Sequence, residues 1–173
     1  GVQLGDFVVV MGAGFVGQII AQCAKKKGAH QVAVVDVLDG KLKLARELGA
    51  DLTINMKKED PVQIIKDLTH GAGADVVIEA AGSESSFNTA TEIIKHNGKF
   101  VFYSWVTQPV TLNISRWHDD GIKFINTCLV HHTWMERYVW TPEALRPVVQ
   151  GHIDIKSLIT NEFKLDDIKK AFD

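Results

Sequence analysis

Cysteine is scarce in this sequence, which argues against a disulfide-stabilised secreted domain. The 173 residues include two cysteines, Cys23 and Cys128, and these do not form a C-x-x-C pair. A reduced protein of the cytoplasm fits this composition best. The sequence also lacks any apolar run near the roughly 18 residues that a membrane span needs. We therefore expect no membrane partner.

Neither sign of charge dominates, and the histidines are not arranged as metal ligands. The net charge of −2 gives no electrostatic reason to expect a nucleic-acid partner. His131 and His132 are adjacent, so their side chains would point to opposite faces of a strand or lie about 100° apart on a helix. His118 stands beside Asp119 and Asp120, which we interpret as a solvated loop. The sequence predicts no metal ligand in this chain.

Apolar, β-branched runs alternate with helical patterns along most of the chain. With 46% apolar and 23% charged residues, the composition is that of a globular domain. The alternation predicts an α/β fold of the doubly wound, Rossmann type, with a mainly parallel sheet and helices on both faces. The expected strands are residues 6–11, 31–36, 51–55, 75–79 and 99–103. The expected helices begin near residues 15, 39 and 61, and a fourth covers 83–95 and is closed by Gly98.

The second half of the chain is less regular. Apolar and polar residues alternate from Val110 to Ser115, which predicts a half-buried edge strand. Ile122 to Leu129 is a further strand candidate. Thr141, with a proline and a glutamate after it, predicts the start of a helix, and Leu165 to Phe172 a final one. In the first helix, Cys23 falls on the apolar stripe, so we expect it in the core.

A glycine pattern follows the first expected strand. Residues 10–17 read VMGAGFVG, which is a G-x-G-x-x-G run. The first glycine permits a tight turn, the second lets backbone approach a phosphate, and the third lets the next helix pack closely on the sheet. We expect a dinucleotide pyrophosphate to bind here, because N–H groups and the dipole at a helix N-terminus favour anions. The residues assigned to this turn are Gly12, Gly14, Phe15, Val16 and Gly17.

An acid stands at the end of the second expected strand. Asp36 follows Gly17 by about twenty residues, the offset expected for the carboxylate that binds the adenosine ribose. It would repel a 2′-phosphate, so NAD is favoured over NADP. Lys41 is either a second contact to this ribose or the adenine, or a solvated lysine. A methyltransferase is disfavoured, because its acid would come just before the glycine loop, where Val8–Met11 is apolar.

Five stretches that together span nearly every residue share the pattern of one family. They are VQLGDFVVVMGAGFVGQIIAQCAKKKGA, LARELGAD, GADVVIEAAGS, IIKHNGKFVFYS and GHIDIKSLITNEFKLDDIKKAF. In these stretches the chain resembles the cofactor-binding domain of zinc-type medium-chain alcohol and polyol dehydrogenases. The resemblance implies a single Rossmann domain over residues 1–173. It also implies that this domain is a piece of a longer enzyme, without its N-terminal catalytic domain and last C-terminal strand.

The resemblance also implies three further cofactor loops. One follows the fourth strand near the adenosine and the nicotinamide, one ends the fifth strand where backbone meets the nicotinamide carboxamide, and one forms the next turn. The residues concerned are Ala80, Ala81 and Gly82; Tyr103, Ser104 and Trp105; and Asn126, Thr127 and Cys128. The chain departs from the family pattern in lacking small residues near Ser104 and Trp105 and a glycine near Phe124. These larger side chains would reshape the nicotinamide end of the cleft.

The function implied by the resemblance is that of an NAD-dependent oxidoreductase acting on an alcohol or polyol. Zinc would polarise the substrate oxygen in the full-length enzyme, with its ligands outside this chain, and we assign no catalytic residue within it. A homo-oligomer, dimer or tetramer, is expected through the sheet edge. One alternative is a standalone nucleotide-sensing Rossmann module, which would not explain the C-terminal stretch. The other is a zinc-free quinone or enoyl reductase, which would commonly favour NADPH.

Overall fold

A six-stranded, all-parallel sheet forms the centre of the molecule. The structure is a computed structural model, and it describes residues 1–127 and 134–172. The strand order is β3-β2-β1-β4-β5-β6, and every neighbouring pair is parallel. The strands are β1 (Phe7–Met11), β2 (Gln31–Asp36), β3 (Leu52–Asn55), β4 (Ala74–Glu79), β5 (Ile94–Phe102) and β6 (Lys123–Asn126). The predicted doubly wound fold is confirmed.

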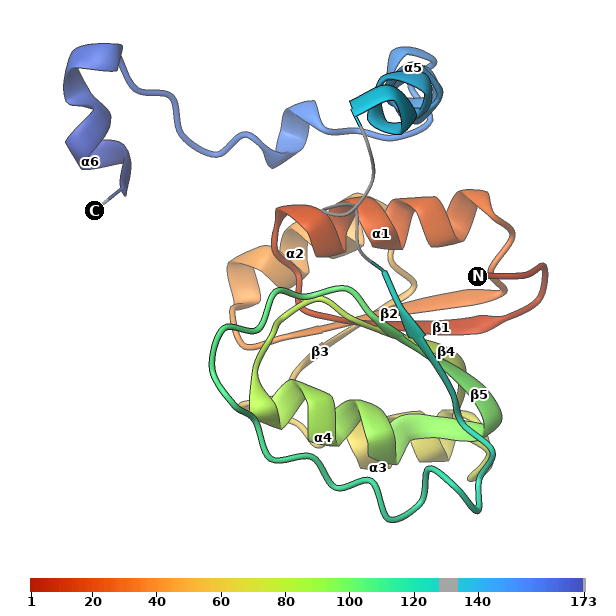
Figure 1. The fold of residues 1–173 in the computed structure, drawn as a ribbon. Helices are drawn as coiled ribbons and strands as arrows, with labels where there is room; N and C mark the ends of the chain where they lie inside the picture. The colour runs from red at the N-terminus through yellow and green to blue at the C-terminus, as the bar shows by residue number, and fades with distance from the viewer. Residues whose placement is uncertain (128–133, 173) are drawn as a thin grey trace.

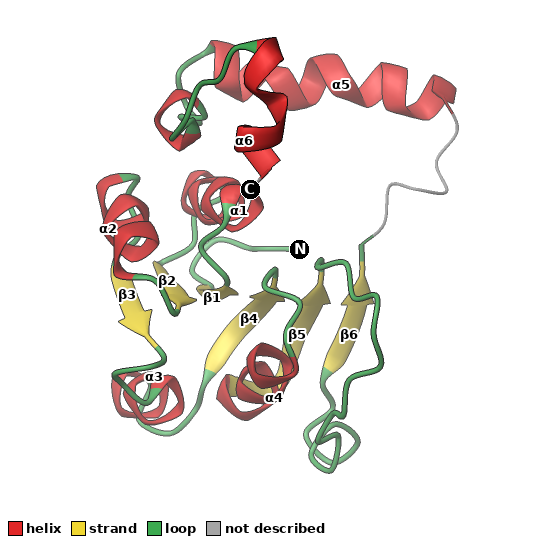
Figure 2. Ribbon diagram, turned by 90° about the vertical axis from the view of Figure 1, so that its left-hand side faces the viewer, coloured by secondary structure: helices red, strands yellow, loops and turns green. Residues whose placement is uncertain are grey.

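Helices cover both faces of this sheet (Figures 1 and 2). Four of them are α1 (Phe15–Lys26), α2 (Asp39–Glu47), α3 (Pro61–Leu68) and α4 (Glu84–Ile93). Successive strand residues point to opposite faces, so Val8 and Val10 pack with α1 and α2 while Val9 packs with α3 and α4. β1 is buried along its whole length, as expected of a central parallel strand.

Helix α1 packs on the sheet through small and amide side chains. Its buried residues are Gly17, Gln18, Ala21, Gln22 and Ala24. The prediction that Cys23 lies in the core is wrong, because this closely packed face is rotated away from the apolar stripe and leaves Cys23 exposed. Neighbouring atoms still desolvate the thiol and raise its pKa, which Lys27 offsets only in part. The thiol therefore stays protonated at neutral pH.

Two acids fasten the amino ends of the central strands. The Asp75 carboxylate accepts the backbone N–H of Phe7 at 2.7 Å, and Lys95 donates to the same carboxylate. Asp51 repeats the arrangement, accepting the N–H of Val32 at 2.7 Å and pairing with a lysine. Burial alone would raise the pKa of each acid, but these hydrogen bonds and the lysine charges outweigh it and hold both pKa values below the usual range. Each acid thus ties one strand to its neighbour where pairing begins.

The junction of α4 and β5 differs from the sequence prediction. The helix expected over residues 83–95 ends at Ile93, and β5 starts at once with Ile94 in extended backbone. Gly98 does not close the helix but lies within β5, where a Cβ would come within 2.6 Å of the Ile94 side chain. The glycine is needed for this close packing rather than for helix termination. Asn97, with φ of 58°, provides the bend.

Residues 110–115 form no strand, so the edge strand predicted there is wrong. The segment runs along α4, and side chains of that helix hold it in place of a backbone ladder. Glu84 accepts the N–H of Thr111 at 2.9 Å, and Asn88 accepts the N–H of Asn113 at 2.8 Å. The alternating pattern has a different origin, because Leu112 packs on the core while its polar neighbours face solvent. The predicted 122–129 strand is β6, and Cys128 and Leu129 lie outside the described residues.

The C-terminal part lies over α1 (Figure 1). It contains α5 (Trp134–Val149), the 3-10 turns η1 (Lys156–Leu158) and η2 (Leu165–Asp167), and α6 (Ile168–Phe172). The prediction that a helix starts at Thr141 is wrong, because α5 begins earlier and continues through Pro142 in its interior. An interior proline removes one N–H bond and disfavours a helix, yet α5 continues on both sides of Pro142. The final helix is confirmed, with η2 as its first turn.

A side chain of α1 attaches the segment after α5. The Gln22 amide donates to the main-chain oxygen of Asp154 at 2.9 Å and accepts its N–H at 2.7 Å. Ile153 beside it is buried, and Asp154 in turn caps η1 through Ser157. Within residues 1–127 and 134–172, no helix combines the length and the apolar character needed to cross a membrane.

Candidate functional site

The predicted site residues lie at one edge of the sheet. They follow the carboxyl ends of β1, β2, β4, β5 and β6, which meet at the same edge because all six strands are parallel. The strand order reverses between β1 and β4, and a parallel α/β sheet binds its ligand in the crevice at such a point. The fold therefore brings together segments that are far apart in the sequence.

The glycine turn between β1 and α1 leaves no room for larger residues. Gly12 has φ of 99°, and a Cβ on Gly17 would stand 1.9 Å from the main-chain oxygen of Gly12. Around Gly14, by contrast, a Cβ would meet nothing within 4 Å. Gly14 is also the N-cap of α1 and offers no side chain to its first turn. The turn thus has an open space in front of a helix N-terminus, which is the setting that binds phosphate.

Asp36 stands beside this turn at the end of β2. Its carboxylate accepts the N–H of Ala13 at 2.7 Å, and the N–H groups of Val37 and Leu38 at 2.7 and 3.0 Å. A carboxylate has about four lone-pair sites, so one further donor can still bind. Asp36 therefore orders the glycine turn and keeps an acceptor for a hydroxyl group.

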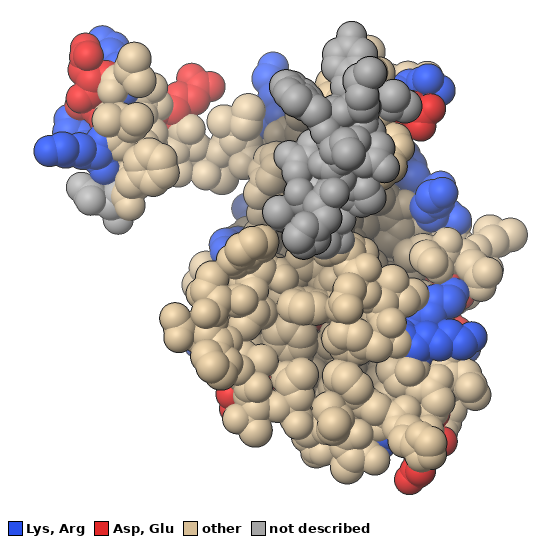
Figure 3. Space-filling model, viewed as in Figure 1, with Lys and Arg blue, Asp and Glu red and all other residues tan. Residues whose placement is uncertain are grey.

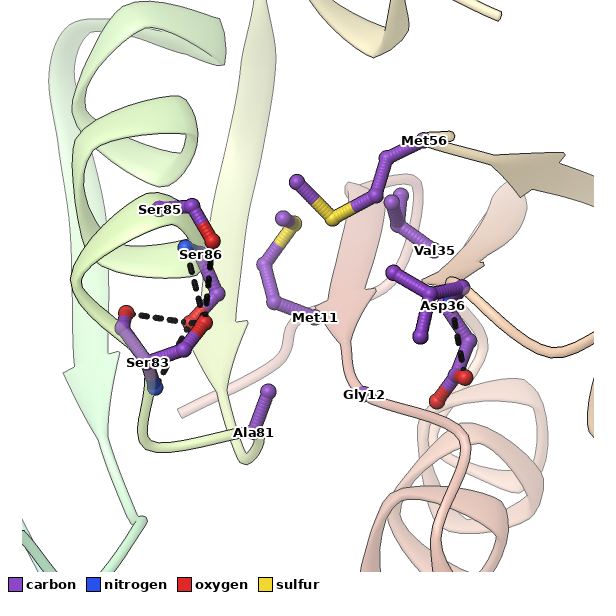
Figure 4. Close-up of a pocket in the computed structure, with 10 residues that line it drawn as sticks. Met11, Gly12, Val35, Asp36, Met56, Ala81, Ser83, Ser85 and Ser86 are labelled. Atoms are coloured by element: carbon purple, nitrogen blue, oxygen red, sulfur yellow. Dashed lines mark hydrogen bonds between the residues drawn. The ribbon is translucent and has the colours of Figure 1, made fainter. Parts of the chain in front are cut away.

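A pocket of about 110 Å³ opens between the two halves of the sheet (Figure 4). Three predicted residues, Gly12, Asp36 and Ala81, line it. The sequence prediction missed the other lining residues, which are Met11, Val35, Val37, Met56, Ser83, Ser85 and Ser86. Met11 and Met56 point toward each other across its floor, and the three serines belong to the N-terminus of α4. The available signal for the methionines and valines was their position at or directly after strand ends, whereas the serines belong to the start of the next helix.

Lys41 lies on the exposed side of α2 and is not among the pocket-lining residues. Its main-chain oxygen accepts the buried Gln18 amide at 2.9 Å, and that amide also reaches Ala13 at 3.2 Å. Gln18 thus links the glycine turn to the start of α2. Sequence reasoning missed Gln18, because it belongs to no recognised motif.

The basic group at the end of β3 is already paired. Lys58 donates to Asp39 at 2.6 Å, and Asn55 donates to the same carboxylate at 2.6 Å. These hydrogen bonds hold the pKa of Asp39 below its usual value. The positive charge of Lys58 is therefore compensated by Asp39 rather than directed at the pocket.

Glu79 at the end of β4 is a further residue that sequence reasoning missed. It is fully buried, and its carboxylate accepts hydrogen bonds from Ala81, Gly82, Ser86 and Ser104. Two predicted loops, 80–82 and 103–105, are thereby held by one side chain. An acid at the end of an apolar strand was the available signal, because ligands of a parallel α/β sheet bind outside the carboxyl ends of its strands.

The ends of β5 and β6 carry the remaining predicted residues. Tyr103 and Trp105 are exposed, 43% and 75%, so neither is a packing residue of the described part. Thr127 bonds to the main-chain oxygen of Phe102 through both its N–H and its hydroxyl, at 3.1 and 3.0 Å. Asn126 pairs in register with Phe102. The carboxyl ends of β4, β5 and β6 thus lie side by side at the same end of the sheet.

Charge is sparse on the face that Figure 3 shows, where basic and acidic side chains lie mostly at the margins. Within the two described ranges, no group of three or more His, Cys, Asp or Glu residues is placed to hold a metal ion. Zinc has no fitting site on these residues. His131 and His132 lie outside the described residues.

Three comparisons with known proteins agree on one family. The family described as zinc-binding dehydrogenase matches residues 16–141. The chain is 36% identical to erythritol/L-threitol dehydrogenase of Mycolicibacterium smegmatis, with 97% of this chain and 45% of that protein covered. It is 29% identical to L-threonine 3-dehydrogenase of Bacillus subtilis, covering 98% and 48%. Zinc-dependent alcohol dehydrogenase 2 from Streptococcus pneumonia superimposes with a TM-score of 0.88 at 28% identity, covering 99% and 48%. The chain spans about half the length of the curated relatives it matches.

Proposed function

The chain belongs to the zinc-binding dehydrogenase family, and we propose that it is the NAD-binding half of a medium-chain alcohol or polyol dehydrogenase. The observation that carries the proposal is the position of Asp36 beside the glycine turn, at the mouth of an open pocket. In such an oxidoreductase, bound NAD accepts a hydride from the substrate. This chain would bind the cofactor and present one face of its nicotinamide.

Each part of the site has a task in this proposal. The first turn of α1 binds the pyrophosphate with its N–H groups, in the space that Gly14 leaves open. Asp36 accepts a hydroxyl of the adenosine ribose, and the pocket between Val37 and Ala81 takes the adenine. Loop 80–82 runs from this pocket toward the nicotinamide half, which the loops at 103–105 and 126–127 border. Lys41 is exposed close to Asp36 in sequence, and a contact to the ribose stays a prediction.

NAD is proposed over NADP for two reasons. A 2′-phosphate would meet the Asp36 carboxylate, which bonds to the glycine turn and is therefore fixed. Lys58, the basic residue after β3, pairs with Asp39 instead of offering its charge to a phosphate. The same preference separates this proposal from the alternative of a zinc-free reductase that uses NADPH.

Zinc and substrate belong to the rest of the enzyme in this proposal. The residues described here offer no fitting zinc site, and the relatives are about twice as long as this chain. Their names support an alcohol, polyol or hydroxy amino acid as the substrate class, of which we propose an alcohol or polyol. The comparisons support a dehydrogenase rather than a nucleotide-sensing module, since each relative named above is a dehydrogenase.

Assembly and location stay predictions. β6 ends the sheet, and Phe124 on it is 39% exposed, so a second copy could extend the sheet at this edge. We propose a homo-oligomer, a dimer or tetramer, through β6. Because residues 110–115 form no strand, they are not part of this proposed edge. A cytoplasmic location rests on the cysteine content alone.

Fluorescence titration with NADH and NADPH tests the cofactor assignment. Wild type is expected to bind NADH at least about tenfold more tightly than NADPH, because a phosphate beside a fixed carboxylate is repelled. Asp36→Ala should weaken NADH binding and reduce the difference in affinity between NADH and NADPH. Asp119→Ala, which replaces an exposed acid away from the site, is the control and should change neither the NADH nor the NADPH affinity. Equal affinities of the wild type for both cofactors would refute the ribose assignment.

A further inference from the structure

Glu79 has a fully buried carboxyl side chain. Its side chain is 0% exposed at the end of β4. In the part of the chain that the structure describes, Glu79 takes part in no ion pair. Burying a carboxylate is unfavourable unless hydrogen-bond donors replace the lost water. The donors around Glu79 therefore indicate what this charge holds in place.

Four donors surround the carboxylate. Oε1 accepts the N–H groups of Ala81 and Gly82 at 2.9 and 2.8 Å and the hydroxyl of Ser86 at 2.6 Å. Oε2 accepts the hydroxyl of Ser104. Hydrogen bonds to an ionised acceptor are stronger than neutral ones. Glu79 thus makes its strongest contacts with groups at the cofactor edge of the sheet.

These donors come from three separate segments. Ala81 and Gly82 form the loop after β4, Ser86 lies in the first turn of α4, and Ser104 follows β5. The main-chain oxygen of Glu79 also accepts the N–H of Ser104 at 3.1 Å. A Cβ on Gly82 would lie 3.4 Å from the Ser104 Cβ, so the loops are in contact. One carboxylate thereby joins two strand ends and a helix N-terminus.

The joined segments border one half of the cleft. With the order β3-β2-β1-β4-β5-β6, a dinucleotide crosses at the reversal between β1 and β4. Asp36 marks the adenosine half and Ala81 lines the pocket assigned to the adenine, so loop 103–105, which lies farther along the sheet at the end of β5, is on the nicotinamide half. We propose that Glu79 is a positioning residue that fixes the wall of the nicotinamide half by fastening Ser104 to the loop after β4. The inference rests on the proposed function, because it requires a nicotinamide dinucleotide in this cleft.

Ser104→Ala separates this role from folding. The variant removes the hydroxyl that joins the two segments and leaves the three bonds to Oε1 in place. ADP-ribose shares every part of NADH except the nicotinamide, so it does not use the wall that Ser104 completes. The variant is expected to bind NADH about fivefold to tenfold more weakly, in line with the net loss of one ordinary hydrogen bond, and to bind ADP-ribose within about twofold of wild type.

Glu79→Gln is the second variant. Its amide oxygen can still accept the loop N–H groups, and its NH₂ can donate to the Ser104 hydroxyl, which can rotate to accept. NADH affinity should therefore fall less than in Ser104→Ala. Because both residues act through one contact, the double variant should bind NADH as Ser104→Ala does. Ser157→Ala, which also removes a hydroxyl bonded to a carboxylate but away from this edge, is the control.

Titration of each variant with NADH and with ADP-ribose, beside thermal unfolding, decides the matter. A selective loss for NADH supports the positioning role. Equal losses for both ligands, no loss for either, or additive effects in the double variant would overturn it. Failure of the wild type to bind either ligand would instead refute the proposed function, so the two failures are distinguishable.

Discussion

Gly17 has a hydrogen atom where every other residue has a Cβ, and the turn has no space for that carbon. A Cβ there would lie 1.9 Å from the oxygen of Gly12, which is backbone and cannot move aside without opening the turn. At Gly14, the same atom would meet nothing. The two glycines therefore serve different purposes. Gly17 is required by the fold, whereas the fold makes no such demand at Gly14, where the proposed function places a phosphate.

Gly17→Ala should destabilise the protein by about 2–4 kcal/mol, because the methyl group overpacks the turn. Urea unfolding measures this change. Gly40→Ala is the matched control, since Gly40 lies in α2 with open space at its Cβ. It should gain up to about 1 kcal/mol from helix propensity. Equal stability of wild type and Gly17→Ala would contradict the geometry of the turn.

Gly14→Ala should leave stability within about 0.5 kcal/mol of wild type, because its φ of −69° and ψ of −178° suit alanine. Its methyl group would occupy the space in front of α1, so the variant should bind NADH at least about tenfold more weakly than wild type. Parallel urea and fluorescence measurements test this pair of outcomes. Unchanged NADH affinity would mean that the pyrophosphate lies elsewhere.

At the scale of elements, the amino ends of β1 and β2 depend on ionised acids. The pKa of Asp75 is lowered in the folded state, so this group contributes stability that is fully present above its unfolded pKa of about 4 and is lost as pH falls through the folded pKa. The pKa of Asp51 is also lowered in the folded state, so its contribution to stability is likewise lost as the pH falls. Acidification should therefore loosen the end of the sheet opposite the cofactor cleft.

Asp75→Asn tests this dependence. At pH 7 it should cost about 1–2 kcal/mol, because Lys95 loses its charged partner. Near pH 3 the difference from wild type should shrink, since the wild-type acid is becoming protonated. Urea unfolding across this range measures both, with the exposed Asp119→Asn as control. A difference that does not change with pH would show that the charge of Asp75 contributes nothing.

Elements with strong hydrophobic periodicity could be predicted from the sequence. The predicted bounds of β2 match the structure, and the glycine turn and Asp36 lie together at the carboxyl ends of the strands, as expected. Three of the errors share one cause, which is that tertiary contacts replaced local signals. Side chains of α4 hold residues 110–115, Gly98 is small because Ile94 packs on it, and the packed face of α1 excludes Cys23. Glu79 and Gln18 belong to no motif, and only the folded arrangement gives them a role.

For the whole molecule, the proposal places zinc and substrate outside this chain. The purified chain should retain no stoichiometric zinc and should not oxidise alcohols, while still binding NADH. Elemental analysis and the absorbance of NADH check this, and a full-length relative such as L-threonine 3-dehydrogenase is the positive control. One tightly held zinc per chain would overturn the assignment.

The central pairing of β1 with β4 also governs how the molecule assembles from its unfolded chain. Three helices and two strands lie between β1 and β4 in the chain, and every neighbouring pair is parallel, so no tight hairpin can start the sheet. Pairings between distant segments form slowly, because the loop must close before its contacts stabilise it. The cleft has the glycine turn on the β1 side and the Glu79 loop on the β4 side. It exists only after that pairing, so recovery of cofactor binding during refolding reports the closing of the sheet rather than the growth of its helices.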